Sequence, residues 1–85
     1  MERLYILEAQ EFIPMVGYKH IGYVNKIFKT KRKACQYYDN NYRTVDNEPN
    51  GLRRLNAYNT YRSDWHPETN LRYVVRRFDC EVLTL

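Results

Sequence analysis

The sequence has few of the residues that long loops and covalent cross-links need. Its 85 residues include only three glycines and three prolines, which leaves little material for flexible linkers. The two cysteines, Cys35 and Cys80, belong to no motif, and no secretory signal peptide is recognisable. We therefore expect one folded domain over residues 1–85, intracellular and soluble, with reduced thiols.

Long apolar runs are also missing. No apolar stretch approaches the roughly 20 residues that a membrane-spanning helix needs, so no membrane partner is expected. Hydrophobic residues make up 44% and charged residues 28%, which is ordinary for a globular protein and argues against global disorder. A chain of this length buries a modest core, so its stability depends on good packing or on a partner.

Signatures of catalysis and metal binding are absent as well. Ser63 is the only serine and lies outside any nucleophile-elbow pattern. Cys35, Cys80, His20 and His66 are scattered singly, without the close ligand pair of most structural zinc sites. There is no glycine-rich phosphate loop, and the ten carboxylates show no paired-acid pattern. A Cys35–histidine dyad is conceivable, but a buried thiol is usually inert. The sequence predicts a protein that is not an enzyme, with no catalytic residue, metal site or cofactor.

Tyrosine and positive charge are what the sequence has in excess. Nine tyrosines suit a small core that is never far from water, and they suit interfaces and base-stacking surfaces as well. Fourteen Lys and Arg against ten Asp and Glu give a net charge of +4 and a pI near 9.2. This excess favours a polyanionic partner or an anionic surface.

The pattern of apolar and turn residues predicts an α+β fold. We expect a small antiparallel or mixed sheet of three to five strands, with one main helix packed on one face. Residues 3–8 and 21–28 read as the first two strands, with extended chain over 12–16. Pro14 belongs at an edge, a bulge or a kink. Residues 17–22 look like a turn, although Gly17 could instead be a bulge within a longer strand.

The second strand leads directly into the predicted helix. Thr30 is a suitable N-cap for it. The predicted buried stripe has three- and four-residue spacing and consists of Ala34, Cys35, Tyr38 and Tyr42. The pair Asn40-Asn41 suits the C-terminus, which gives a helix of about three turns.

The second half of the chain is less regular. Residues 43–51 read as a surface loop. The spacing of Leu52, Leu55 and Tyr58 allows a short helical turn, whereas residues 58–62 could equally be extended. Residues 63–70 predict a turn that leads into a strand, with Trp65 as a core anchor rather than a ligand platform. Residues 71–78 form the clearest strand, and residues 80–85 would extend it after a kink at Asp79.

The strand–helix junction concentrates positive charge. No acidic residue occurs between Phe12 and Tyr38. A helix N-terminus prefers Asp or Glu, yet three consecutive cations occupy the predicted first turn. Free backbone N–H groups and these side chains would bind an anion such as a phosphate, although a solvated lysine-rich face is the simpler explanation. The junction cations are Lys26, Lys29, Lys31, Arg32 and Lys33.

A second basic set lies in the last strand and the segments before it. Arg72 and Arg76 share one strand face with Val74 and Phe78, and Arg77 lies opposite. Alternating arginine and aromatic side chains on a sheet could bind single strands by stacking and phosphate pairing. The alternative is that these arginines pair with acidic residues across a hairpin. The other arginines of this set are Arg53, Arg54 and Arg62, and the candidate acids are Asp64, Glu68, Asp79 and Glu81.

Four segments together resemble small uncharacterised proteins of large double-stranded DNA viruses. They are residues 28–39 (FKTKRKACQYYD), 53–57 (RRLNA), 63–65 (SDW) and 71–76 (LRYVVR), and they span most of the region from Gly22 to Arg77. The resemblance implies a viral protein that acts in the cytoplasm or nucleus of a host cell or in the virion. It implies no catalytic residue.

The strand–helix passage over residues 21–39 is similar to the end of AP2-type DNA-binding domains. In that family a sheet is followed by a helix that carries an alanine and a tyrosine-aspartate pair, and here Ala34 and Tyr38-Asp39 match in spacing. The Arg- and Trp-bearing strands that read DNA in that family are not recognisable before Ile21. Some forty residues follow the match without a counterpart, so it covers under a quarter of the chain.

The sequence therefore predicts a small basic module that binds DNA or RNA through phosphate contacts. The residues expected to carry binding are mainly Lys26, Lys29, Lys31, Arg32 and Lys33, together with Arg72 and Arg76. The alternative is a non-enzymatic interaction protein, or a virion structural or assembly protein of a large DNA virus. Such a protein would use tyrosine-rich surfaces and sheet edges to bind itself or a viral or host partner.

Overall fold

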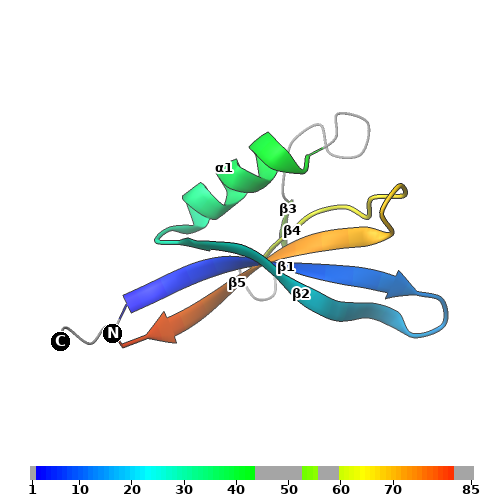
Figure 1. The fold of residues 1–85 in the computed structure, drawn as a ribbon, viewed down its shortest axis with the longest axis horizontal. Helices are drawn as coiled ribbons and strands as arrows, with labels where there is room; N and C mark the ends of the chain where they lie inside the picture. Colours follow the sequence, from blue (N-terminus) through cyan, green and yellow to red (C-terminus); the bar gives the residue numbers. More distant parts are fainter. Residues whose placement is uncertain (1, 44–52, 56–59, 82–85) are drawn as a thin grey trace.

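A computed structural model describes residues 2–43, 53–55 and 60–81 of the chain. Within them the chain forms one five-stranded sheet, in the order β2-β1-β5-β4-β3 with antiparallel pairing throughout, and one helix. The elements are β1 (Glu2–Ile13), β2 (Gly17–Phe28), α1 (Lys31–Asn41), β3 (Arg53–Leu55), β4 (Thr60–Arg62) and β5 (Leu71–Cys80). The helix lies against one side of the sheet (Figure 1). The predicted α+β class is confirmed, in a strand-rich form.

The β1–β2 hairpin is longer than predicted, and its turn lies elsewhere. β1 continues into the predicted extended segment as far as Ile13, but residues 14–16 of that segment form the turn instead. Val16 N–H donates to the Ile13 carbonyl over 3.1 Å, and Met15 has a φ of 68°. Proline at the second position and a positive φ at the third are typical of a type II turn. The predicted turn at residues 17–22 is therefore wrong, because the ring of Pro14, rather than the glycine pair, sets the reversal.

β2 is an edge strand, and it carries features that disfavour pairing with another sheet. Its register against β1 shifts twice, between Ile6 and Glu8 and between Ala9 and Gln10. Such bulges bend a strand and interrupt its ladder. The strand also exposes Lys19, Lys26 and other polar side chains. Lysines and bulges on an edge are common protection against sheet extension.

The helix follows the prediction closely. Thr30 caps its N-terminus, where the hydroxyl accepts a hydrogen bond from Lys33 N–H over 3.1 Å. The helix ends at Asn41, after 11 residues. Ala34 and Tyr38 are buried against the sheet, and the rest of the predicted stripe packs at the edge of the same core.

The core lies between α1 and the central strands β1 and β5. It consists of the buried side chains of Tyr5, Leu7, Ala34, Tyr38, Tyr73 and Val75. Tyr38 is fully buried, and its hydroxyl lies 2.7 Å from His66 Nε2. The ring of Tyr42 stacks on Tyr73 with centroids 4.7 Å apart. Because the hydroxyl of the fully buried Tyr38 has a partner in His66, an amphipathic ring can be accommodated in this small core.

The predictions for residues 52–62 and for Asp79 agree with the structure only in part. Leu55 ends strand β3, so the helical turn through it is wrong, whereas the extended alternative matches β4. Asp79 pairs with Arg3 inside an uninterrupted β5, so the predicted kink is also wrong. Leu52, Tyr58 and the loop beyond Arg43 lie outside the described residues, as do residues 82–85.

The turn before β5 places Trp65 differently from the prediction. Trp65 is 43% exposed and donates its indole N–H to Asn70 Oδ1 over 2.9 Å, so it is not a core anchor. The neighbouring His66 takes the inward position instead and is 5% exposed. Ser63 is buried as well: its hydroxyl accepts from Tyr73 N–H over 2.7 Å and donates to the Asp64 carbonyl.

Asn70 fastens this turn to the end of β1, so replacing it should measurably destabilise the fold. It adopts a φ of 61°, and its side-chain amide donates to the Phe12 carbonyl over 2.8 Å while accepting from Trp65. Asn70→Ala should lower the free energy of unfolding by about 1–2 kcal/mol in urea denaturation, since it loses both bonds and fits the left-handed region poorly. Asn70→Gly keeps the backbone geometry and should lose less. An alanine variant as stable as the parent would contradict this role.

Candidate functional site

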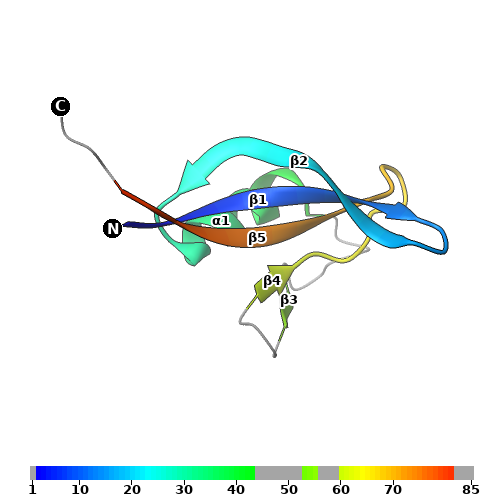
Figure 2. The ribbon, with the colours of Figure 1, turned by 90° about the horizontal axis from the view of Figure 1, so that it is seen from below.

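The sheet face opposite α1 is not covered by any element in the described part of the chain. Figure 2, seen from below, shows this face in front of the helix. Side chains alternate along a strand, and Leu7 and Val75 pack on the helix side. The alternate residues of β1 and β5 therefore face the open side. They include Glu8, Gln10, Phe12, Arg72, Val74 and Arg76, and the paired register adds Tyr18, His20 and Tyr23 from β2.

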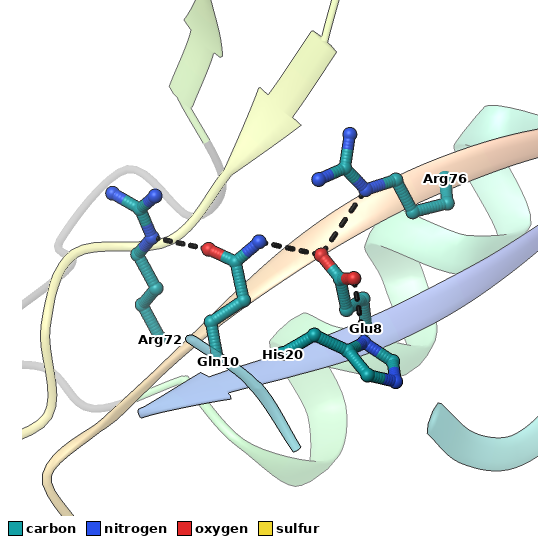
Figure 3. Close-up of polar contacts among 5 residues, drawn as sticks. All are labelled: Glu8, Gln10, His20, Arg72 and Arg76. Atoms are coloured by element: carbon teal, nitrogen blue, oxygen red, sulfur yellow. Dashed lines mark hydrogen bonds and ion pairs between the residues drawn. The ribbon is translucent and has the colours of Figure 1, made fainter. Parts of the chain in front are cut away.

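Glu8 is the centre of a polar network on this face (Figure 3). Its Oε1 accepts hydrogen bonds from Arg76 Nε over 3.1 Å and from Gln10 Nε2 over 2.5 Å. Its Oε2 lies 2.7 Å from His20 Nδ1. Burial raises the pKa of Glu8. This effect is outweighed by the hydrogen bond with His20, the positive charge of Arg76 and the hydrogen bond with the Gln10 amide, so the pKa of Glu8 is lowered overall. Glu8 is only 6% exposed, and it is ionised at neutral pH.

The network continues from Gln10 to a second arginine. Arg72 Nε donates to Gln10 Oε1 over 2.7 Å. The guanidinium carbon of Arg72 also lies 3.5 Å from the centre of the Tyr18 ring, a cation–π contact. Burial and the charge of nearby Arg62 lower the pKa of Arg72, but a guanidinium keeps its charge in proteins. The side chains of Glu8 and Gln10 thus fix two cations on the same face.

Both arginines are held in a way that leaves their outer donors accessible. Arg76 is bound to Glu8, and Arg72 to Gln10, through Nε. In Figure 3 the terminal Nη atoms of both residues point away from these partners. A guanidinium has five N–H donors, so the paired Nη groups can still bind a further anion. The side chain of Arg76 is 50% exposed.

The prediction that Arg72 and Arg76 share a strand face is confirmed. The acid that pairs with Arg76 is not one of the predicted candidates but Glu8, 68 residues earlier in the chain. Sequence reasoning missed Glu8 and Gln10 because it ended the first strand at residue 8. The signal was the alternation from Leu4 onward, which continues through both residues. The side chains of Arg53 and Arg54 lie outside what the structure describes.

The cations of the strand–helix junction form a separate set. Lys29, Arg32 and Lys33 are exposed where β2 ends and α1 begins, as is Lys26 near the end of β2. Lys31 Nζ lies 5.8 Å from the centre of the Tyr61 ring. An open pocket beside them is lined by Lys31, Arg32, Cys35, Gln36, Asp39 and Tyr61. Because α1 covers the other side of the sheet, the junction and the Arg72–Arg76 pair do not form one continuous site.

Cys35 and the two histidines, considered above as catalytic or metal-binding candidates, take part in packing or side-chain contacts within the fold. Burial, with the charge of Asp39, raises the pKa of the Cys35 thiol to about 11, so this thiol stays protonated at neutral pH. His20 contacts Glu8, and His66 contacts Tyr38. Within the residues that the structure covers, no three His, Cys, Asp or Glu side chains gather in a metal-binding group.

The fold and this face define a class: a small basic α+β protein whose antiparallel sheet has one helix-covered face and one open, arginine- and tyrosine-bearing face. No family model, curated protein or solved structure matches the chain. Over the described ranges, no helix has the length and apolar character that a bilayer crossing requires.

Proposed function

We propose that this protein binds nucleic acid through phosphate contacts made by its basic side chains. The observation that carries the proposal is the anchoring of Arg72 and Arg76 through Nε, with their Nη groups directed away from these partners. A guanidinium fork matches the oxygens of a phosphate and binds them in pairs. Because Gln10 and Glu8 already restrict both side chains, binding a phosphate immobilises less than it would on a free arginine.

The strand–helix junction supports the same proposal as a second set of phosphate contacts. Its cations are exposed or half-buried, and no acidic residue occurs in the first turn of α1. The Thr30 hydroxyl accepts from the Lys33 N–H, while earlier N–H groups of a first turn are free to face an anion. Lys26, Lys29, Lys31, Arg32 and Lys33 remain the proposed junction contacts.

A salt-dependent binding series tests the role of the arginine pair. The double variant Arg72→Gln/Arg76→Gln should bind a labelled oligonucleotide about tenfold more weakly in fluorescence anisotropy. The slope of log affinity against log salt should also fall by about 1.5, since two phosphate contacts are lost.

The matched control is Arg3→Gln/Arg77→Gln, which removes the same charge from exposed β1 and β5 positions on the helix side. It should change affinity about twofold at most, through net charge alone. Equal losses in both double variants would show that only net charge matters and would contradict a site on the open face. Charge reversal of Lys31, Arg32 and Lys33 tests the junction separately.

One observation favours the alternative, a protein-interaction or viral assembly role. The β1–β2 hairpin exposes several large apolar side chains, namely Phe12, Met15, Val16, Ile21, Tyr23 and Ile27. Exposed apolar groups of this kind often mark contact surfaces. The bulges and lysines of β2 oppose edge pairing, so such a contact would use side chains rather than sheet extension. A discrete oligomer that survives high salt in light scattering, with no oligonucleotide binding, would replace the nucleic-acid proposal.

A further inference from the structure

The open face carries accessible aromatic rings beside its arginines. Tyr23 is 56% exposed, and its ring centroid lies 4.8 Å from that of His20. Phe12 is 38% exposed and meets Tyr18 edge-on at 5.4 Å. The Tyr18 ring itself is covered by Arg72. Tyr23 and Phe12 therefore present rings on which a further planar group can stack.

The sheet register places the aromatic residues and the arginines at backbone positions on two different pairs of strands. Glu8 pairs with Tyr23 on one side and with Val74 on the other, and Val74 pairs with Arg62. In the next row, Gln10 lies between His20 and Arg72. The rings thus follow β1 and β2, while the arginines follow β5 and β4. With strands about 4.8 Å apart, the backbones of β2 and β5 are separated by roughly 10 Å. The side chain of Arg72 crosses β1, so that its guanidinium carbon lies 3.5 Å from the centre of the Tyr18 ring of β2.

This arrangement matches the two sides of a single polynucleotide strand. Such a strand has phosphates along one side and unpaired bases along the other. Laid along the sheet, it would place phosphates over Arg62, Arg72 and Arg76 and bases over Tyr23 and Phe12. Arg72 and Arg76 are four residues apart, which is about 13 Å along a strand. In a duplex the bases pair edge to edge and stack on the neighbouring base pairs, so their flat sides are not available for stacking on protein rings.

The buried carboxylate of Glu8 does not oppose such a ligand. Glu8 is 6% exposed and is bound by Arg76, Gln10 and His20. Val74 is 4% exposed and forms an apolar floor on β5 between Arg72 and Arg76. The side chain of Arg76 is 50% exposed and that of Glu8 only 8%, so a phosphate above this surface has more access to the guanidinium than to the carboxylate.

We infer that the open face is a binding site for single-stranded nucleic acid, with bases stacked on Tyr23 and Phe12 and phosphates on Arg62, Arg72 and Arg76. This inference rests on the proposed function and names its ligand class. Stacking on an aromatic ring is sequence-tolerant, so we expect little base preference.

The test compares single and double strands with the full chain. The probes are labelled oligo-dT and oligo-rU of about 12 nucleotides, within the range that one small domain covers, and a hairpin duplex of similar length. Both single strands should bind about tenfold more tightly than the duplex. The comparison of oligo-dT with oligo-rU distinguishes DNA from RNA as the preferred single strand.

The ring variants separate stacking from charge. Tyr23→Ala should weaken single-strand binding about tenfold, while its salt slope and its duplex binding stay unchanged. Tyr23→Phe keeps the ring and should bind like the parent. Ile27→Ala removes another exposed apolar side chain of β2 and should also bind like the parent. Thermal unfolding followed by circular dichroism checks that each variant is folded.

Each outcome bears on a different claim. Equal or tighter duplex binding, or an unchanged Tyr23→Ala variant, overturns the single-strand inference but leaves the proposed function standing if Arg72→Gln/Arg76→Gln still lowers affinity. No binding to any of the probes overturns both.

Discussion

Replacing Tyr38 by alanine is expected to lower the free energy of unfolding by about 3–5 kcal/mol, as for other large aromatic residues in cores. The side chain is fully buried between α1 and the sheet, and its ring lies 5.7 Å from Tyr73 and 6.1 Å from Tyr42. In a protein of this size such a loss is a large part of the total stability, so urea denaturation followed by circular dichroism should show a partly unfolded population in buffer.

Tyr38→Phe is the matched variant that isolates the hydroxyl. It keeps the ring but removes the 2.7 Å contact with His66 Nε2. The expected loss is about 1–2 kcal/mol, because the buried His66 loses one hydrogen-bond partner. A phenylalanine variant as stable as the parent would mean that the tyrosine is retained for its ring alone.

Replacing Glu8 by glutamine is expected to lower the free energy of unfolding by about 1–3 kcal/mol at neutral pH. The carboxylate accepts bonds from Arg76 and Gln10 and contacts His20, and an amide cannot satisfy all three. The loss should be measured by urea denaturation. Glu2→Gln makes the same charge change at an exposed position of β1 and serves as the control.

The effect of Glu8→Gln should depend on pH with a definite sign. The pKa of Glu8 is lowered from its ordinary value of 4.5, so the folded state holds the ionised form more strongly than the unfolded state does. That stabilisation is complete above the unfolded pKa and disappears as the pH falls through the folded pKa. Parent and variant stabilities should therefore begin to converge as the pH falls below about 4.5 and continue to do so through the lower folded pKa. Parallel curves from neutral to acid pH would contradict the network.

The predictable part of the fold was the part that local chemistry determines. Thr30 can cap a helix wherever it precedes one, and the spacing of Ala34 and Tyr38 marks a buried face without reference to the rest of the chain. The strand at residues 71–78 was equally clear, because its β-branched and aromatic run needs no partner to be recognised. These elements appear in the structure at or within two residues of their predicted bounds.

The features that were predicted wrongly or missed depend on contacts between distant segments of the chain. The sequence predicts Trp65 as a core anchor, but in the turn that Asn70 closes the neighbouring His66 takes the inward position instead. The network on the open face joins Glu8 to Arg76, and only the pairing of β1 with β5 brings them together. The nucleic-acid role came from charge and composition, and it stays a proposal that the binding series tests.

The order of strands in the sheet has a consequence for how the chain folds. β1 lies between β2 and β5, so residue 2 pairs with residue 80 and the central ladder joins opposite ends of the described chain. Sheets dominated by such distant pairing fold slowly. During synthesis the β1–β2 hairpin can form early, yet one side of β1 keeps its backbone N–H and C=O groups unpaired until β5 has left the ribosome. The nascent chain is thus most prone to aggregation before its last strand arrives.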